Sequence, residues 1–148
     1  MSTTGIHAFD TTVQVTNRWL HNIMDRLGTT DRQGAYHFLR GVLHALRDRL
    51  SPEQAAALGS QLPMLVRGIF FEGWRPQGKP LKIRQKEEFL KIVEAELTPG
   101  GPSVEAVTRA VLEVLSRHVS TGEVQHLRHA LPAEIRDLFA EEFHTLWF

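Results

Sequence analysis

The sequence predicts an all-α fold: a helical bundle built from two tandem four-helix repeats, offset by 69 residues and related by a pseudo-two-fold axis. Three observations support this prediction. Apolar residues recur throughout at the spacing of one helix face, without the alternation that is typical of strands. The chain matches itself when it is shifted by 69 residues. Helix-start signals stand at corresponding places in both halves.

The self-match is clearest between residues 42–70 and residues 111–139. These segments align without a gap and share 9 identities in 29 positions, where average residue usage would give about two. The identities include Leu62-Pro63 with Leu131-Pro132, Arg67 with Arg136, and Phe70 with Phe139. We therefore expect one compact domain over residues 1–148, divided into repeat 1 at about 11–74, a basic linker at 75–86 and repeat 2 at about 87–148.

The first two helices of repeat 1 are each expected to bury one apolar stripe. The first stripe consists of Val13, Thr16, Leu20, Ile23, Met24 and Leu27. Gly28 follows that stripe, where a C-terminal cap belongs. Asp31 is a suitable N-cap for the second helix, and the stripe of that helix is Phe38, Leu39, Val42, Leu43, Leu46 and Leu50.

The third and fourth helices of repeat 1 open with capping chemistry. Ser51 suits the N-cap, Pro52 the first helical position, and Gln54 the reciprocal position of a capping box. Pro63 opens the fourth helix. The residues of this helix that are expected to face inward are Leu65, Val66, Ile69 and Phe70.

Repeat 2 is expected to follow the same plan, with helices near residues 85–97, 104–118, 121–129 and 133–145. Ser120 takes the place of Ser51, and Glu123 is predicted to reach back to the N-cap. Pro132 starts the last helix, and Phe139 fills its buried side.

The composition is that of an ordinary globular chain. Hydrophobic residues make up 42% and charged residues 23% of the sequence, and 17 basic residues balance 17 acidic ones. The neutral net charge favours neither nucleic acid nor membrane as a partner. There is no cysteine, which excludes disulfides and thiolate chemistry. No secretory signal or membrane-spanning stretch is apparent, so we expect a cytoplasmic location.

The segment HALRDRLSPEQAAALGSQLPMLVRGIFFEGWRP, residues 44–76, is echoed by RHVSTGEVQHLRHALPAEIRDLF, residues 117–139. These segments resemble a bacterial family of small all-helical proteins, Domain of Unknown Function family 2267. The resemblance covers most of the chain. It implies a helical bundle that stands alone or is joined to regulatory modules, and it brings no catalytic residues.

The basic linker is the sharpest charge asymmetry in the chain. It contains five cations and no acid: Arg75, Lys79, Lys82, Arg84 and Lys86. These side chains could contact the phosphates of an anion or a nucleic acid. The structural alternative, which we favour, is a solvated linker stiffened by Pro76 and Pro80.

Two further sets of polar residues have structural alternatives that we favour. Arg67 and Arg136, like Arg40 and Arg109, are paired by the repeat; they could form an anion site, or each could pair with a carboxylate or a carbonyl of its own repeat. His126 and His129, near His118, have a spacing that can bind zinc, but surface histidines are the simpler interpretation. His37 and His44 are expected on the wet side of their helix.

Aromatic residues stand at the C-terminal end of each half of the chain. Trp74, Trp147 and Phe148 are candidates for a patch that contacts a partner protein, provided that they are uncovered. Searches for nucleophile, phosphate-loop and dinucleotide motifs find none. We therefore predict a non-catalytic helical interaction or regulatory module without a cofactor, whose partner is another protein or a second copy of the chain. The alternative is a weak, sequence-nonspecific nucleic-acid or anion binder acting through residues 75–86.

Overall fold

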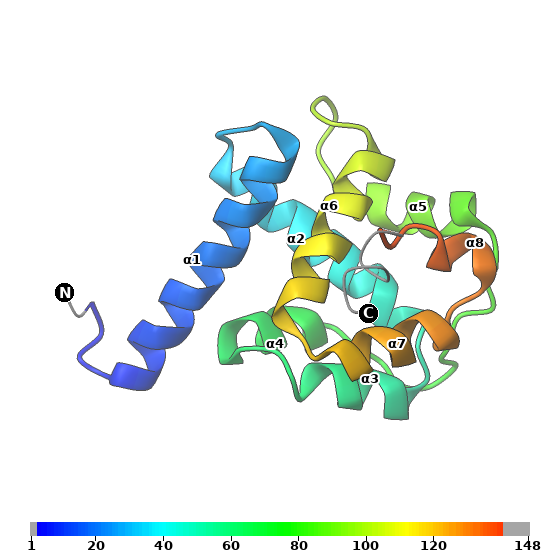
Figure 1. Cartoon of the computed structure of the whole chain (residues 1–148), viewed down its shortest axis with the longest axis horizontal. Helices are drawn as coiled ribbons and strands as arrows, with labels where there is room; N and C mark the ends of the chain where they lie inside the picture. The colour runs from blue at the N-terminus through cyan, green and yellow to red at the C-terminus, as the bar shows by residue number, and fades with distance from the viewer. Residues whose placement is uncertain (1–2, 141–148) are drawn as a thin grey trace.

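Eight α-helices make up the part of the chain that the computed structural model describes, residues 3–140. Within these residues every regular element is helical, which confirms the all-α prediction (Figure 1). The helices are α1 (His7–Leu27), α2 (Arg32–Asp48), α3 (Pro52–Gly59), α4 (Met64–Phe71), α5 (Lys86–Glu94), α6 (Val104–His118), α7 (Thr121–Ala130) and α8 (Ala133–Arg136). None of the described helices is both long enough and apolar enough to cross a membrane.

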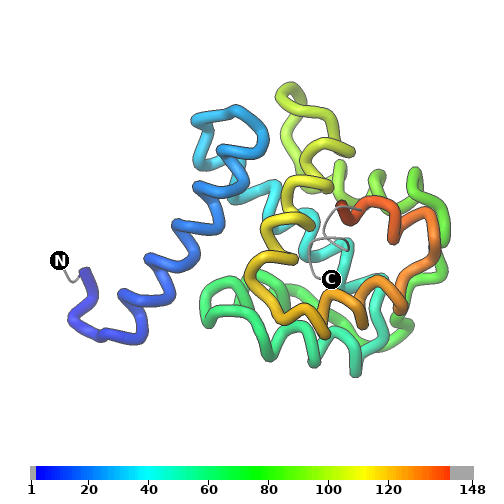
Figure 2. The backbone as a smooth tube through the Cα atoms, viewed as in Figure 1, coloured from blue at the N-terminus to red at the C-terminus, as the bar shows by residue number. Residues whose placement is uncertain are grey.

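Helix α2 lies at the centre of the bundle and contacts α1, α4, α5 and α6. Its residues are buried almost continuously from Leu39 to Arg47, because neighbours cover it on several sides. One apolar core extends through both halves of the chain, and its largest fully buried side chains are Trp19, Phe70 and Phe89. The N-terminal half of α1 extends away from this body, as the backbone trace shows (Figure 2).

Local capping chemistry starts and stops several of the helices. Gly28 ends α1 with a left-handed φ of 64°, which an L side chain adopts reluctantly. The Asp31 side chain accepts a hydrogen bond from the Gly34 N–H and starts α2. Ser51 starts α3 with a complete capping box, in which the Gln54 N–H lies 3.2 Å from Ser51 Oγ and the Ser51 N–H lies 2.9 Å from Gln54 Oε1.

The start of α7 differs from the predicted capping box. Ser120 Oγ accepts a hydrogen bond from the Glu123 N–H at 3.1 Å, as an N-cap should. The Ser120 N–H, however, donates to Gln61 Oε1 at 2.8 Å, and Gln61 Nε2 lies 3.2 Å from Ser120 Oγ. The prediction that the Glu123 side chain reaches back is therefore wrong, because a residue from the first half of the chain already fills that position.

Arg67 and Arg136 make the same hydrogen bonds in the two halves. Arg67 Nε donates to the Gly59 carbonyl at 2.9 Å, and its Nη2 donates to the Leu62 carbonyl at 2.9 Å. Arg136 Nε donates to the Arg128 carbonyl at 2.7 Å, and its Nη2 donates to the Leu131 carbonyl at 2.9 Å. Each guanidinium thus holds the end of one helix to the helix that follows Pro63 or Pro132, and both are structural.

The last predicted helix is shorter than expected. It was predicted over residues 133–145, but α8 ends at Arg136 and continues as a turn over residues 137–139. The N–H groups of Leu138 and Phe139 bond to carbonyls three residues back, so the chain tightens out of the α-helix at this point. Phe139 is nevertheless 97% buried, being 3% exposed. Residues 141–145 lie outside the described residues.

Two residues assigned to the core by their spacing are exposed instead. Val13 is 43% exposed and Leu65 is 41% exposed. Val13 lies in the N-terminal half of α1, next to Thr12, which contacts the start of α4; the core side chains of α1 begin at Thr16, so the apolar stripe extends beyond them. Leu65 lies at the start of α4, where its N–H donates to Thr12 Oγ1 of α1 at 2.9 Å.

Candidate functional site

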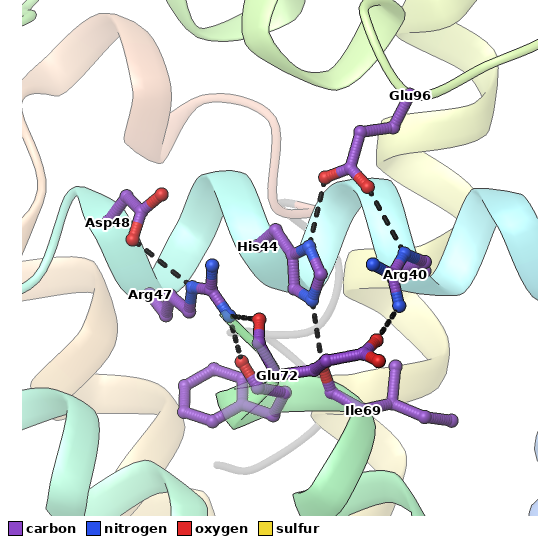
Figure 3. A network of polar contacts seen from close by, with 8 residues as sticks. Arg40, His44, Arg47, Asp48, Ile69, Glu72 and Glu96 are labelled. Carbon is purple, nitrogen blue, oxygen red and sulfur yellow. Dashed lines mark hydrogen bonds and ion pairs between the residues drawn. The ribbon is translucent and has the colours of Figure 1, made fainter. Parts of the chain in front are cut away.

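A partly buried polar network joins α2, α4 and the residues that follow α5 (Figure 3). His44, which was expected on the wet side of its helix, is only 6% exposed. Its Nδ1 lies 2.9 Å from Glu96 Oε2, and its Nε2 lies 2.8 Å from the Ile69 carbonyl. The prediction for His44 is wrong because α4 and the residues after α5 cover the face of α2 that the apolar stripe alone leaves open.

The arginines of the network have structural partners. Arg40 forms ion pairs with Glu72 and Glu96. Arg47 is 6% exposed, and its Nη1 donates to the carbonyls of Phe70 at 2.8 Å and Glu72 at 2.6 Å. These carbonyls lie at the C-terminal end of α4, where backbone acceptors lack helical partners. Chemically, the network caps the C-terminal end of α4 through Arg47 Nη1.

Arg109, the counterpart of Arg40 in the self-match, has partners in its own half of the chain. It pairs with Glu105 at 2.9 Å and donates to the Asp137 carbonyl at 2.9 Å. The structure therefore does not bring the four repeat-paired arginines, Arg40, Arg67, Arg109 and Arg136, to one anion site.

The basic linker folds back on the end of α2. The Leu81 N–H donates to the Asp48 carbonyl at 2.8 Å, and Arg49 Nε donates to the Ile83 carbonyl at 2.7 Å. An open cavity of about 410 Å³ lies where the linker folds back. Four cations line it, with Gly78, Pro80 and Leu81 completing the wall: Arg49, Lys79, Lys82 and Arg84.

The charge of this cavity, which we name the cationic pocket, is not neutralised locally. None of its four cations forms an ion pair with a carboxylate of residues 3–140. Arg49 is only 9% exposed, and burial, with a smaller contribution from the positive charge of Arg84, lowers the pKa of Arg49. The arrangement is chemically suited to holding a compact anion, which would relieve the repulsion.

The five cations predicted from the linker are thus divided. Lys79, Lys82 and Arg84 meet in the cationic pocket, whereas Arg75 is exposed outside it. Lys86 opens α5 and pairs with Glu105 at 3.3 Å. Arg49 was missed by sequence reasoning, because no local pattern at the end of α2 indicates which distant loop will close over it.

A second candidate site is an exposed apolar surface. It comprises Ile6, Phe9, Val13, Met64 and Leu65, which are the large hydrophobic residues that the structure shows as exposed among those it describes. The first three have i, i+3 and i+7 spacing at the start of α1, and the other two begin α4 beside it (Figure 1). The hydrogen bond from the Leu65 N–H to Thr12 Oγ1 holds the two groups together. We name these five residues the apolar surface.

The aromatic partner patch predicted from the sequence is placed differently. Trp74 is half-buried and packs against the core, with its ring centroid 5.2 Å from that of Phe71. Trp147 and Phe148 lie outside the described residues. Sequence reasoning missed the apolar surface because it assigned Val13 and Leu65 to the core and gave Ile6 and Phe9 no role.

The histidines weighed as zinc ligands do not converge. His118 stacks on Trp19, with ring centroids 4.5 Å apart, and burial, followed by the charge of Arg18, lowers the pKa of His118. His126 and His129 lie on α7 beside Glu123. No group of three or more histidines and acidic residues is arranged to hold a metal ion in residues 3–140.

The fold and these sites define a small all-helical protein with ligand-sized cavities and an uncovered apolar face. A comparison with protein families places it more closely: the family described as "Uncharacterized conserved protein (DUF2267)" matches residues 16–138. The chain belongs to this family, as the segments at 44–76 and 117–139 indicated. A search of the curated proteins finds no match.

Proposed function

We propose that this protein is a non-catalytic helical interaction module, and that its apolar surface binds a second copy of the same chain. The observation that carries the proposal is that five exposed apolar side chains stand at the starts of α1 and α4, two neighbouring segments that the hydrogen bond from the Leu65 N–H to Thr12 Oγ1 joins. Their exposed fractions run from 41% to 53%. Contiguous apolar patches on soluble proteins commonly mark interaction sites.

The charge around the apolar surface favours a second copy as the occupant. Among residues 5–17, Asp10 is the one charged residue at neutral pH, and Asp10 Oδ1 accepts hydrogen bonds from the N–H groups of Thr3 and Thr4. The net charge of the chain is zero. Two identical surfaces therefore meet with little like-charge repulsion, because the neighbouring charges are one acid, Asp10 on α1, and one base, Arg67 on α4. The exposed polar residues Thr11, Gln14 and Asn17 would supply an uncharged rim.

Sedimentation equilibrium tests this proposal. We expect the average mass of the wild-type protein to rise from one chain towards two with concentration. Phe9→Lys should raise the dimer dissociation constant by at least about tenfold, because it places a charge in a desolvated interface. Thr98→Lys adds the same charge to an exposed residue between α5 and α6 and should leave the constant unchanged.

Three outcomes would contradict self-association through this surface. The wild-type protein could remain one chain at every concentration, the Phe9→Lys variant could associate as tightly as wild type, or the Thr98→Lys control could dissociate equally. A monomer that co-purifies with another protein, and loses it in the Phe9→Lys variant, would assign the apolar surface to a different partner.

We also propose that the chain is one domain made of two copies of a four-helix unit, α1–α4 and α5–α8, joined by residues 75–86. The supporting observations are the gap-free self-match and the hydrogen bonds of Arg67 and Arg136, whose donors and acceptors are all 69 residues apart. We further propose a bacterial origin, because the family resemblance implies one. We also propose a cytoplasmic location, which suits a chain without cysteine.

A second function, anion binding, is favoured by the cationic pocket. The cations converge on one cavity instead of spreading along a line, so the geometry favours a compact phosphate-bearing anion over a nucleic-acid backbone. Each bound phosphate oxygen would accept hydrogen bonds from lysine or arginine donors that have no carboxylate partner among the described residues.

Calorimetric titration with pyrophosphate tests the anion proposal. The triple variant of pocket cations, Lys79→Gln, Lys82→Gln and Arg84→Gln, should weaken binding by at least about tenfold. A control with the same loss of charge on exposed residues elsewhere, Arg32→Gln, Arg75→Gln and Lys91→Gln, should keep most of the affinity. Equal losses of pyrophosphate affinity in both triple variants would show that binding depends only on the net charge of the chain, which would contradict a specific pocket. Binding of duplex DNA without binding of pyrophosphate would favour an extended contact and contradict the compact anion.

A further inference from the structure

Glu123 is a buried carboxylate without a structural partner. It lies in the first turn of α7 and is only 7% exposed. A glutamate at this position ordinarily bonds to the N–H of the N-cap residue, but Gln61 Oε1 occupies the Ser120 N–H. Among residues 3–140 no group donates a hydrogen bond to the Glu123 carboxylate. The capping role that would explain this residue is therefore absent.

Partial burial of such a group has an energetic cost. A carboxylate that loses part of its hydration is destabilised, and no ion pair or hydrogen bond within residues 3–140 replaces what is lost, although the Glu123 oxygens keep contact with the solvent in the cavity. Burial accordingly raises the pKa of Glu123, while the nearby His126 acts in the opposite direction. Uncompensated buried acids are concentrated at functional sites, because a ligand can supply the missing partner.

The Glu123 side chain lines a cavity of about 380 Å³ between α3 and α7. The walls contributed by Ala57, Leu127 and Ala130 are apolar. Gln54 and His126 also line it. The size is that of a small-molecule site, and the combination of apolar walls with a few polar groups is typical of such sites.

The polar groups of this cavity include both donors and acceptors. Gln54 Oε1 accepts from the Ser51 N–H, which leaves the Gln54 Nε2 group as a donor. His129 Nδ1 lies 2.9 Å from the Gln125 carbonyl. A carbonyl oxygen only accepts, so Nδ1 carries the proton, and Nε2 of the neutral ring is left as an acceptor. With the Glu123 carboxylate, this gives the cavity two acceptors. A ligand with donor groups can bond to these two acceptors, and a positive charge would compensate the Glu123 carboxylate.

We propose that this cavity binds a small organic cation, a primary ammonium or guanidinium group on a short apolar chain, with Glu123 as its counter-ion. The charged head would meet Glu123, and the chain would lie against the alanine and leucine walls. A carboxylate or phosphate ligand would instead meet the Glu123 charge and be repelled. The proposal is independent of the apolar surface and of the cationic pocket.

Backbone amide NMR shifts during titration with n-butylammonium test the proposal. The titration is carried out at about pH 8, where unperturbed imidazoles are neutral and do not compete with the ligand. We expect saturable shifts confined to the residues of α3 and α7 around the cavity. Glu123→Gln keeps the shape and removes the charge, and it should weaken binding by at least about tenfold. Glu134→Gln, an exposed acid in the first turn of α8, is the matched control and should bind as wild type does.

Two further measurements complete the test. Butanol, which has the same chain length without the charge, should bind at least about tenfold more weakly than n-butylammonium. The thermal midpoint of Glu123→Gln should be no lower than that of Glu134→Gln, since both acids lie at helix starts and Glu123 has no structural partner. Unchanged ammonium affinity in Glu123→Gln, equal binding of butanol, or a midpoint of Glu123→Gln well below the control would each overturn the proposal.

Discussion

Phe70→Ala is expected to lower the free energy of unfolding by about 3–5 kcal/mol, through lost transfer energy and the cavity left behind. Phe70 has no exposed surface, and its ring packs edge-on against Phe71 with centroids 4.8 Å apart. It also belongs to the core that both halves share. Urea denaturation of the wild-type and variant proteins measures the difference.

Phe139→Ala should show a loss of the same size if the two halves are copies of one unit. Phe139 is 3% exposed, lies in the same core, and has the Arg128 guanidinium 5.8 Å from its ring centroid. Thr98→Ala is the control, because Thr98 is exposed and lies outside both the core and the apolar surface; its cost should stay within about 0.5 kcal/mol. A near-native stability for Phe139→Ala beside a large loss for Phe70→Ala would argue against the equivalence of the two units.

Arg47→Met is expected to cost about 3 kcal/mol. The methionine keeps much of the apolar stem but removes the guanidinium, so the carbonyls of Phe70 and Glu72 lose their donor in a buried position. Leaving a buried acceptor unsatisfied costs about 1–3 kcal/mol for each group. Urea denaturation again gives the value.

The matched control for Arg47 is Arg26→Met. Arg26 pairs with Glu113 at 2.7 Å; its own side chain is 43% exposed and that of Glu113 is 14% exposed, but Glu113 keeps a second cationic partner, Arg117, at 3.8 Å. Loss of the Arg26 guanidinium should cost no more than about 1 kcal/mol. If Arg47→Met were as mild as Arg26→Met, the bonds from Arg47 to the end of α4 would contribute little to stability.

The helices could be predicted from the sequence largely because their starts and ends are determined locally. Ser51 and Gln54 lie three residues apart, and the bonds of their capping box are made within that interval. Gly28 ends α1 through its own backbone conformation. Such signals need no knowledge of the rest of the chain, and the predicted bounds of α6, residues 104–118, match the structure.

The candidate sites depend instead on contacts between distant segments. Arg49 enters the cationic pocket only because residues 81–83 fold back on it. His44 is buried because Ile69 and Glu96 meet its ring from segments 25 and 52 residues away. Val13 has the helical spacing of a core residue, but spacing does not reveal where the core stops. Polar and edge positions are therefore the places where single-sequence reasoning fails.

The hydrogen bonds between Gln61 and Ser120 have a consequence for the order in which segments of the chain fold during synthesis. The two residues are 59 positions apart, so Gln61 leaves the ribosome well before the helix that it caps. The first half can present Gln61 at the turn between α3 and α4 as a template, and α7 completes its first turn by docking there. Synthesis of the second half on its own would produce α7 with the Ser120 N–H open to water.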